Sequence, residues 1–95
     1  MTMTFGEALD ALKNGYRVVR RSWQLYDPGS FICRQKGYPT GIPINENTAE
    51  ATGLEEGTTM RFRPYLMVVL TDGSAMPWTP SQLDLFAEDW QILKD

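Results

Sequence analysis

The sequence contains no histidine and only one cysteine, Cys33. Without histidine, the chain lacks the usual general base, the commonest metal ligand and the side chain that titrates near neutral pH. A single cysteine permits neither a disulfide within the chain nor a thiolate zinc site, and this count suits a reducing cytosol. We therefore expect a cytoplasmic protein with no metal and no cofactor.

Long apolar runs and an excess of basic charge are also missing. The longest apolar run, Tyr65 to Leu70, is far too short to cross a bilayer, and the N-terminus has no basic-then-apolar leader. Nine Lys and Arg against twelve Asp and Glu give a net charge of −3, which argues against a nucleic acid polymer as partner. With 42% hydrophobic and 22% charged residues, the 95 residues have the composition of one soluble globular domain without a membrane partner.

The clearest local signal is a helix near the N-terminus. Thr4 and Glu7 have the spacing of a capping box, in which each side chain bonds the other residue's backbone N–H. Phe5, Ala8, Leu9 and Leu12 then form one apolar stripe at helical spacing. Asn14-Gly15 supplies a stop, so the pattern predicts a helix that ends near Lys13.

Several short segments favour strands. Asp27-Pro28-Gly29 and Asp72-Gly73 are turn signals between such segments. The predicted strands are Tyr16–Arg20, Phe31–Cys33, Met60–Leu70 with Leu66–Leu70 as its buried part, Ser74–Trp78 and Trp90–Leu93. Arg61, Arg63 and Tyr65 then share one strand face, where the arginines either meet phosphate or keep that face solvated.

A second helix is predicted after Trp78. Thr79 at the N-cap, Pro80 at the first helical position and Gln82 two positions later are three agreeing signals. Leu83, Phe86 and Ala87 give this helix an apolar side. Together the elements predict an α+β fold, a single domain over 1–95 with an antiparallel sheet of about four or five strands and two short helices.

Residues 35–59 do not fit this pattern. Prolines and glycines interrupt the segment and four glutamates add charge, so we expect an irregular surface excursion, with one helical turn near Thr48 to Leu54. Connections of this length in small domains are usually functional or mobile.

The case for catalysis is weak. The carboxylates Asp72, Asp84, Glu88 and Asp89 are the available acid–base groups, and each is more simply a turn or helix-end residue. There is no nucleophile elbow and no glycine-rich phosphate loop. An enzyme that cleaves nucleotides with Asp84 or Glu88 and a metal is one hypothesis, and the absence of histidine counts against it.

Two constellations favour binding instead. Arg20 and Arg21 lie beside Trp23 just after a strand, and they pair guanidinium groups for phosphate with an indole face for stacking. Trp78 directly precedes a helix N-terminus, where backbone N–H groups donate to anions and Ser81 and Gln82 add hydrogen bonds. In the alternative interpretation, Trp23 and Trp78 are core residues and Ser81 and Gln82 only cap the helix. Trp90, in an alternating strand, is predicted to be core.

Two blocks of the sequence resemble a known family. Residues 3–9, read with Val18-Val19-Arg20-Arg21-Ser22-Trp23, form the first block. Arg63-Pro64-Tyr65, Asp72-Gly73 and the long block from Trp78 to Trp90 form the second. These residues resemble a small phage and prophage family associated with Thoeris anti-defence protein two, with residues 35–59 left unmatched.

The resemblance implies a sponge that acts in the bacterial host cytosol during infection. Members bind cyclic nucleotide immune signals without cleaving them, typically a glycocyclic ADP-ribose and in some cases cyclic dinucleotides. They resemble homotetramers with ligand pockets between subunits. Carried over residue by residue, the resemblance assigns ligand binding to Arg20, Trp23, Trp78, Ser81, Gln82 and Asp84. Arg21 joins this predicted set because of its place between Arg20 and Trp23.

The chain departs from the family pattern after Trp23. Family members usually continue with Asn-Gly-Lys, whereas this chain has Gln24-Leu25-Tyr26 and then Asp27-Pro28-Gly29. Pro80 also stands where a small residue is usual. If the loop after Trp23 forms a pocket wall, ligand choice is altered. The competing hypothesis is a small protein-interaction or toxin-like prophage module with no nucleotide ligand.

Overall fold

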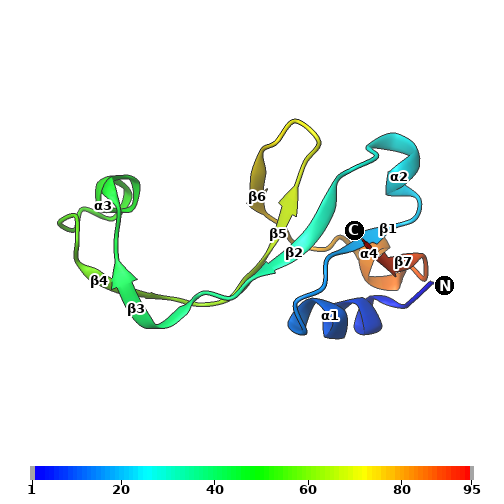
Figure 1. Ribbon diagram of the computed structural model, residues 1–95, viewed down its shortest axis with the longest axis horizontal. Coiled ribbons are helices and arrows are strands. Elements are labelled where there is room, and N and C mark those ends of the chain that lie inside the picture. Colours follow the sequence, from blue (N-terminus) through cyan, green and yellow to red (C-terminus); the bar gives the residue numbers. More distant parts are fainter. Residues whose placement is uncertain (1, 95) are drawn as a thin grey trace.

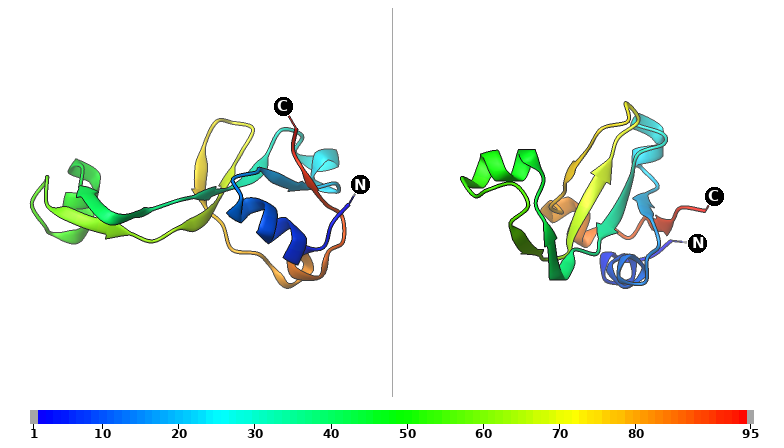
Figure 2. Two further views of the ribbon diagram at one scale, coloured as in Figure 1. Left: turned by 60° about the horizontal axis from the view of Figure 1, so that its bottom comes forward. Right: turned by 60° about the vertical axis from the view of Figure 1, so that its left-hand side comes forward.

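The computed structural model describes residues 2–94, which adopt the predicted α+β fold (Figure 1). The elements, in chain order, are α1 (Phe5–Lys13), β1 (Val18–Arg20), α2 (Trp23–Tyr26), β2 (Phe31–Gln35), β3 (Tyr38–Pro43), α3 (Glu46–Thr52), β4 (Thr59–Phe62), β5 (Tyr65–Val69), β6 (Ala75–Pro77), α4 (Gln82–Phe86) and β7 (Trp90–Ile92). A body carries the first and last elements, and a hairpin of β3 and β4 extends from it as an arm (Figures 1 and 2). The arm makes the molecule elongated, 47 × 28 × 26 Å.

The body is built on a five-stranded antiparallel sheet with strand order β6-β5-β2-β1-β7. Its strand count agrees with the sequence prediction. Ile32 of β2 pairs with Val18 on one side and with Val68 on the other, so three apolar side chains line up across the sheet. The turn at Asp72-Gly73 joins β5 to β6 as predicted, with Gly73 at φ 88°.

Helix α1 closes the core over this sheet. The capping box between Thr4 and Glu7 is present, as predicted, and Ala8 and Leu12 are fully buried. They pack in one cluster with Val18, Ile32 and Trp90, so the predicted core role of Trp90 is confirmed. Burying a side chain the size of leucine stabilises a fold by about 1.5–3 kcal/mol, so this cluster holds the body together.

Residues 35–59 leave the body as an arm, and the helical turn expected near Thr48 to Leu54 overlaps helix α3, but the segment is regular rather than irregular. The segment supplies β3, helix α3 and the start of β4, and β3 pairs with β4 as a two-stranded sheet. Asn45 caps α3 by accepting a hydrogen bond from the Thr48 N–H at 2.9 Å, and Gly53 ends it in the left-handed region at φ 77°. The hairpin has a register shift between Tyr38 and Ile42. That irregularity hides the alternation by which strands are recognised in a sequence.

The segment after Trp23 also differs from the prediction. Helix α2 forms before the turn at Asp27, which closes with the Ser30 N–H donating to the Asp27 carbonyl at 3.2 Å. Strand β4 ends at Phe62 and β5 begins at Tyr65, because Pro64 lacks an N–H for the ladder. Arg61 and Arg63 therefore do not share one continuous strand with Tyr65.

The second predicted helix begins two residues later than expected. Its N-cap is Ser81 rather than Thr79, and Gln82 is the first helical residue of α4. Ser81 and Asp84 form a full capping box, and Arg20 also holds Asp84 in place, which favours this pair over the alternative of Thr79 with Gln82. Of the apolar side expected for this helix, Ala87 packs against the core, whereas Leu83 is 79% exposed and Phe86 81% exposed.

The cap assignment predicts a matched pair of effects. Ser81→Ala removes the hydroxyl that accepts from the Asp84 N–H at 3.1 Å, and loss of such a cap costs about 1 kcal/mol. Thr79→Ala removes a hydroxyl with no role in the cap and is expected to change stability by less than about 0.5 kcal/mol. Urea unfolding of the two variants measures the difference, and equal losses would return the N-cap to Thr79.

Candidate functional site

Four aromatic side chains from distant parts of the sequence meet in the body. The Trp23 ring centroid lies 5.3 Å from Trp90 and 6.0 Å from Trp78, and Trp78 lies 6.0 Å from Trp90. Phe5 completes the group at 5.5 Å from Trp90. The pairs around Trp90 are edge-to-face, the arrangement that the ring quadrupoles favour. Trp90 is fully buried, whereas Trp23 and Trp78 are half-buried and keep part of their surface accessible.

Trp23 and Trp78 line the same open groove, a cavity of about 270 Å³. Its remaining wall comes from α2 and its following turn and from β5 and β6: Tyr26, Asp27, Ser30, Val68, Leu70 and Met76. Val68 and Met76 are register partners, so they present their side chains to the groove together. The surface is almost entirely apolar and aromatic, which suits a flat ring that stacks rather than a charged group.

A polar bridge fixes the two sides of this groove. The Thr71 hydroxyl donates to Asp27 Oδ1 at 2.7 Å, and the Ser30 hydroxyl donates to the Asp27 carbonyl at 2.9 Å. These bonds connect the end of α2 to the turn between β5 and β6. The loop after Trp23 therefore forms part of the groove wall.

Behind the aromatic cluster lies an ion-pair network centred on Arg20. Its Nε donates to Asp89 Oδ1 at 2.8 Å and its Nη1 donates to Asp84 Oδ1 at 3.1 Å, with 20% of the Arg20 side chain exposed. Asp89 also accepts from the Ser22 N–H at 3.1 Å. The Asp84 carbonyl accepts from the Trp90 indole N–H at 3.0 Å. The network thus ties β1, α4 and the aromatic cluster together.

The charges in this network shift two pKa values. The hydrogen bond to Asp89 raises the pKa of Arg20, and it outweighs the opposing effect of burial. Burial by itself raises the pKa of Asp89, but the bonds from Arg20 and Ser22 outweigh it, and the pKa of Asp89 is lowered. Both groups are therefore held in their charged forms as a pair. Elsewhere in the body, burial raises the pKa of the Cys33 thiol on β2, so this side chain is a poor nucleophile.

The seven predicted site residues fall into separate places. Trp23 and Trp78 line the groove, while Arg20, Asp84 and Ser81 bond one another through the network and the helix cap. Arg21 is exposed beside a second cavity of about 410 Å³, which Ser22, Gln24, Leu25 and Asp89 also line. Gln82 is exposed at the start of α4. No cluster of three His, Cys, Asp or Glu side chains that would hold a metal occurs within residues 2–94.

Comparison of the sequence with known proteins places the chain in a family. The model of the Thoeris anti-defense 2-like domain matches residues 3–93, nearly the whole chain. The chain is also 30% identical, over an alignment of 97 residues, to the protein named Thoeris anti-defense 2 from Bacillus phage SP01, covering 96% of this chain and 94% of that protein.

The chain belongs to the Thoeris anti-defense 2-like family. The matched range, residues 3–93, includes the residues of the arm. Among the described residues, no helix is long and apolar enough to cross a bilayer.

Sequence reasoning missed part of the groove of this Thoeris anti-defense 2-like chain. Tyr26 was placed in a loop, and Met76 was placed on a strand without a role, yet both line the groove and both are more than half exposed. Met76 was accessible to prediction, because a hairpin at Asp72-Gly73 pairs it with Val68. Tyr26 was not, since its position depends on helix α2.

Proposed function

We propose that this chain is a phage anti-defence protein that binds a cyclic nucleotide immune signal in the groove between Trp23 and Trp78. It sequesters the signal without cleaving it. The observation that carries the proposal is the half-buried indole pair on an apolar groove, in a member of an anti-defence family. A glycocyclic ADP-ribose is the first candidate ligand, and a cyclic dinucleotide is the second.

The affinity of such a site comes from stacking. Base–aromatic stacking contributes about 1–3 kcal/mol per base in proteins that bind single strands. Trp78 and Trp23 hold fixed orientations because they pack edge-to-face on each other and on Trp90. A preformed wall loses little side-chain entropy when the ligand binds, so more of the stacking energy appears as affinity.

Phosphate recognition falls to Arg21 rather than Arg20 in this proposal. Arg20 already donates to two carboxylates, whereas Arg21 is exposed and its backbone N–H is held by the Asp89 carbonyl at 2.8 Å. A hydrogen bond to a charged group contributes about 1.5–3 kcal/mol. Arg20, Ser81 and Asp84 then act by positioning Trp78 and α4, and Gln82 supplies a free amide at the helix start.

We further propose that the chain works as a homo-oligomer, a tetramer by analogy with the family. Its accessible surface is 6947 Å², against about 5,500 Å² for a compact monomer of this mass. Large apolar side chains are also left in water: Leu25, Tyr26, Leu83 and Phe86 are each at least 79% exposed. Exposed apolar side chains of this kind mark association surfaces.

The test combines binding and turnover. Purified protein is incubated with glycocyclic ADP-ribose isomers and cyclic dinucleotides, freed of unbound ligand by filtration, and then heat-denatured, and the released compounds are identified by mass spectrometry. An intact nucleotide released only on denaturation supports sequestration. A chemically altered nucleotide would establish an enzyme. The interaction module would be favoured if the protein retains no nucleotide and a partner protein instead covers the exposed apolar side chains of α2 and α4.

A further inference from the structure

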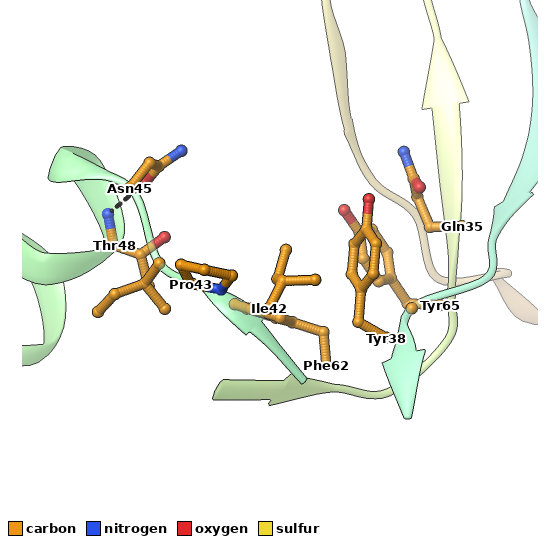
Figure 3. Close-up of a pocket in the computed structure, with 10 residues that line it drawn as sticks. Gln35, Tyr38, Ile42, Pro43, Asn45, Thr48, Phe62 and Tyr65 are labelled. Carbon is orange, nitrogen blue, oxygen red and sulfur yellow. Dashed lines mark hydrogen bonds between the residues drawn. The ribbon is translucent and has the colours of Figure 1, made fainter. Parts of the chain in front are cut away.

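The arm carries a cavity of its own, separate from the groove at Trp23 and Trp78. Its volume is about 310 Å³, and it opens where the arm leaves the body (Figure 3). Three parts of the chain line it. The ends of β2 and β5 contribute Gln35 and Tyr65, the hairpin contributes Tyr38, Ile42 and Phe62, and the start of α3 contributes Asn45 and Thr48.

Aromatic rings form one wall of this arm cavity. Tyr38 is 51% exposed and Tyr65 is 45% exposed, so both keep ring surface that no other side chain covers. Phe62 meets Tyr38 edge-to-face at 6.5 Å and holds its orientation. In Figure 3 the two tyrosine hydroxyls point the same way as the Gln35 amide. The wall thus presents flat apolar faces with polar groups along one rim.

Two side-chain amides supply the polar groups. Asn45 uses its Oδ1 to accept from the Thr48 N–H, and its Nδ2 group lies on the side away from that bond in Figure 3, ready to donate. Gln35 approaches only the weak acceptor Met67 Sδ, at 3.7 Å from its Nε2, and its Oε1 has no donor among the described residues. A free donor and a free acceptor beside aromatic faces match the edge of a nucleobase.

The residues that line the cavity carry no formal charge, but positive charge lies next to it. Lys36 falls between two lining residues, and Arg61 and Arg63 flank Phe62. The two arginines line an adjacent cavity of about 300 Å³ that shares Phe62 with the first. Arg61 and Arg63 alternate with Phe62 at the end of β4, so they lie on the face of the hairpin opposite the tyrosine wall, and the arm cavity itself is neutral.

We propose that the arm cavity binds one purine ring, as a nucleoside or as the base of a nucleotide whose phosphate stays outside the cavity. A volume of about 310 Å³ is at the low end for ligand sites, so it takes a single base rather than a dinucleotide. The site is independent of the groove proposed above for the immune signal. Either site can fail without the other.

The test is an NMR titration of the whole protein with guanosine, adenosine, their 5′-monophosphates and ribose 5-phosphate. The reporters separate the sites, because all three tryptophans lie in the body while Tyr38 and Tyr65 lie at the arm cavity. We expect shifts at the arm tyrosines with the purines and none with ribose 5-phosphate. Shifts confined to the tryptophan indoles, or no shifts at all, would overturn the proposal.

Variants sharpen the result. Tyr38→Ala with Tyr65→Ala is expected to weaken purine binding at least tenfold, whereas the matched control Tyr16→Ala, at a tyrosine 55% exposed on the body, leaves it unchanged. If the double variant does not fold, Gln35→Leu at an exposed position serves instead and is expected to weaken binding several-fold. Arg61→Met, on the opposite face of the hairpin, is a second control and should leave purine binding unchanged. Purine binding that is unchanged in the double tyrosine variant and in Gln35→Leu would overturn the proposal. Tyrosine shifts that depend on protein concentration alone would also overturn it, because they would assign the cavity to another copy of the chain.

Discussion

Trp78→Ala is expected to weaken retention of a glycocyclic ADP-ribose about 5- to 150-fold while the chain stays folded. The estimate takes the loss of one stacked base as about 1–3 kcal/mol, with a factor of ten for each 1.4 kcal/mol. The variant also loses contacts with Phe5, Trp23 and Trp90. A fully buried tryptophan would cost about 3–5 kcal/mol, and half-buried Trp78 about half of that. Calorimetric titration measures the affinity, and circular dichroism measures the fold.

Two further variants separate stacking from packing. Trp78→Phe keeps a ring in the aromatic cluster and is expected to give an intermediate affinity with little loss of stability. Met76→Glu places a carboxylate on the groove wall at a side chain that is 56% exposed, so it should repel an anionic ligand without disturbing the core. If Trp78→Ala unfolds and Met76→Glu binds normally, Trp78 is a core residue and the groove is not the site.

The sequence was most informative where local signals agree with one another. The capping box at Thr4, the apolar stripe of α1 and the stop at Gly15 all describe the same helix, so its bounds were predicted correctly. Near Ser81 the local signals conflict. Thr79 and Ser81 are both hydroxyl residues with a suitable partner three residues later, Gln82 and Asp84 respectively. Arg20 decides between them by holding Asp84 from a distant strand, and no local pattern carries that information.

The same limit applies to the candidate site. Residue type alone left Trp23 and Trp78 open between a core role and a binding role, and the family resemblance favoured binding; in the structure both are half-buried and line one groove. The role of Arg20 depends on where Asp89 lies in the fold, which spacing in the sequence does not reveal. The arm was missed for a related reason. Its strands pair only with each other and its helix is short, so its pattern carries few apolar positions.

Arg20→Met and Arg21→Met are expected to affect different properties, although the residues are neighbours: the first lowers stability and the second lowers affinity for the nucleotide. Arg20→Met leaves Asp84 and Asp89 without their cation. Removing one partner of a buried pair costs about 3–5 kcal/mol, and partial exposure of this pair reduces the cost to about 2 kcal/mol. In a domain of this size that lowers the Tm by about 8–16 °C. Arg21→Met removes an exposed guanidinium, so stability should change by less than about 0.5 kcal/mol while affinity for the nucleotide falls.

Acid unfolding adds a second readout for the Arg20 network. The pKa of Asp89 is lowered in the fold, so its contribution to stability is complete above its ordinary pKa and is lost as the pH falls through the lower, folded value. In Arg20→Met the main partner that lowers this pKa is gone while burial still raises it, so the acid-induced loss of stability that Asp89 causes should become smaller, which is a shift toward a flatter pH profile. Thermal unfolding between about pH 2 and pH 7 measures this shift, and Arg21→Met should follow the parent chain. If Arg20→Met instead keeps its stability and its acid profile but loses affinity, Arg20 is a ligand-binding residue, as the family resemblance implies, and the network is incidental.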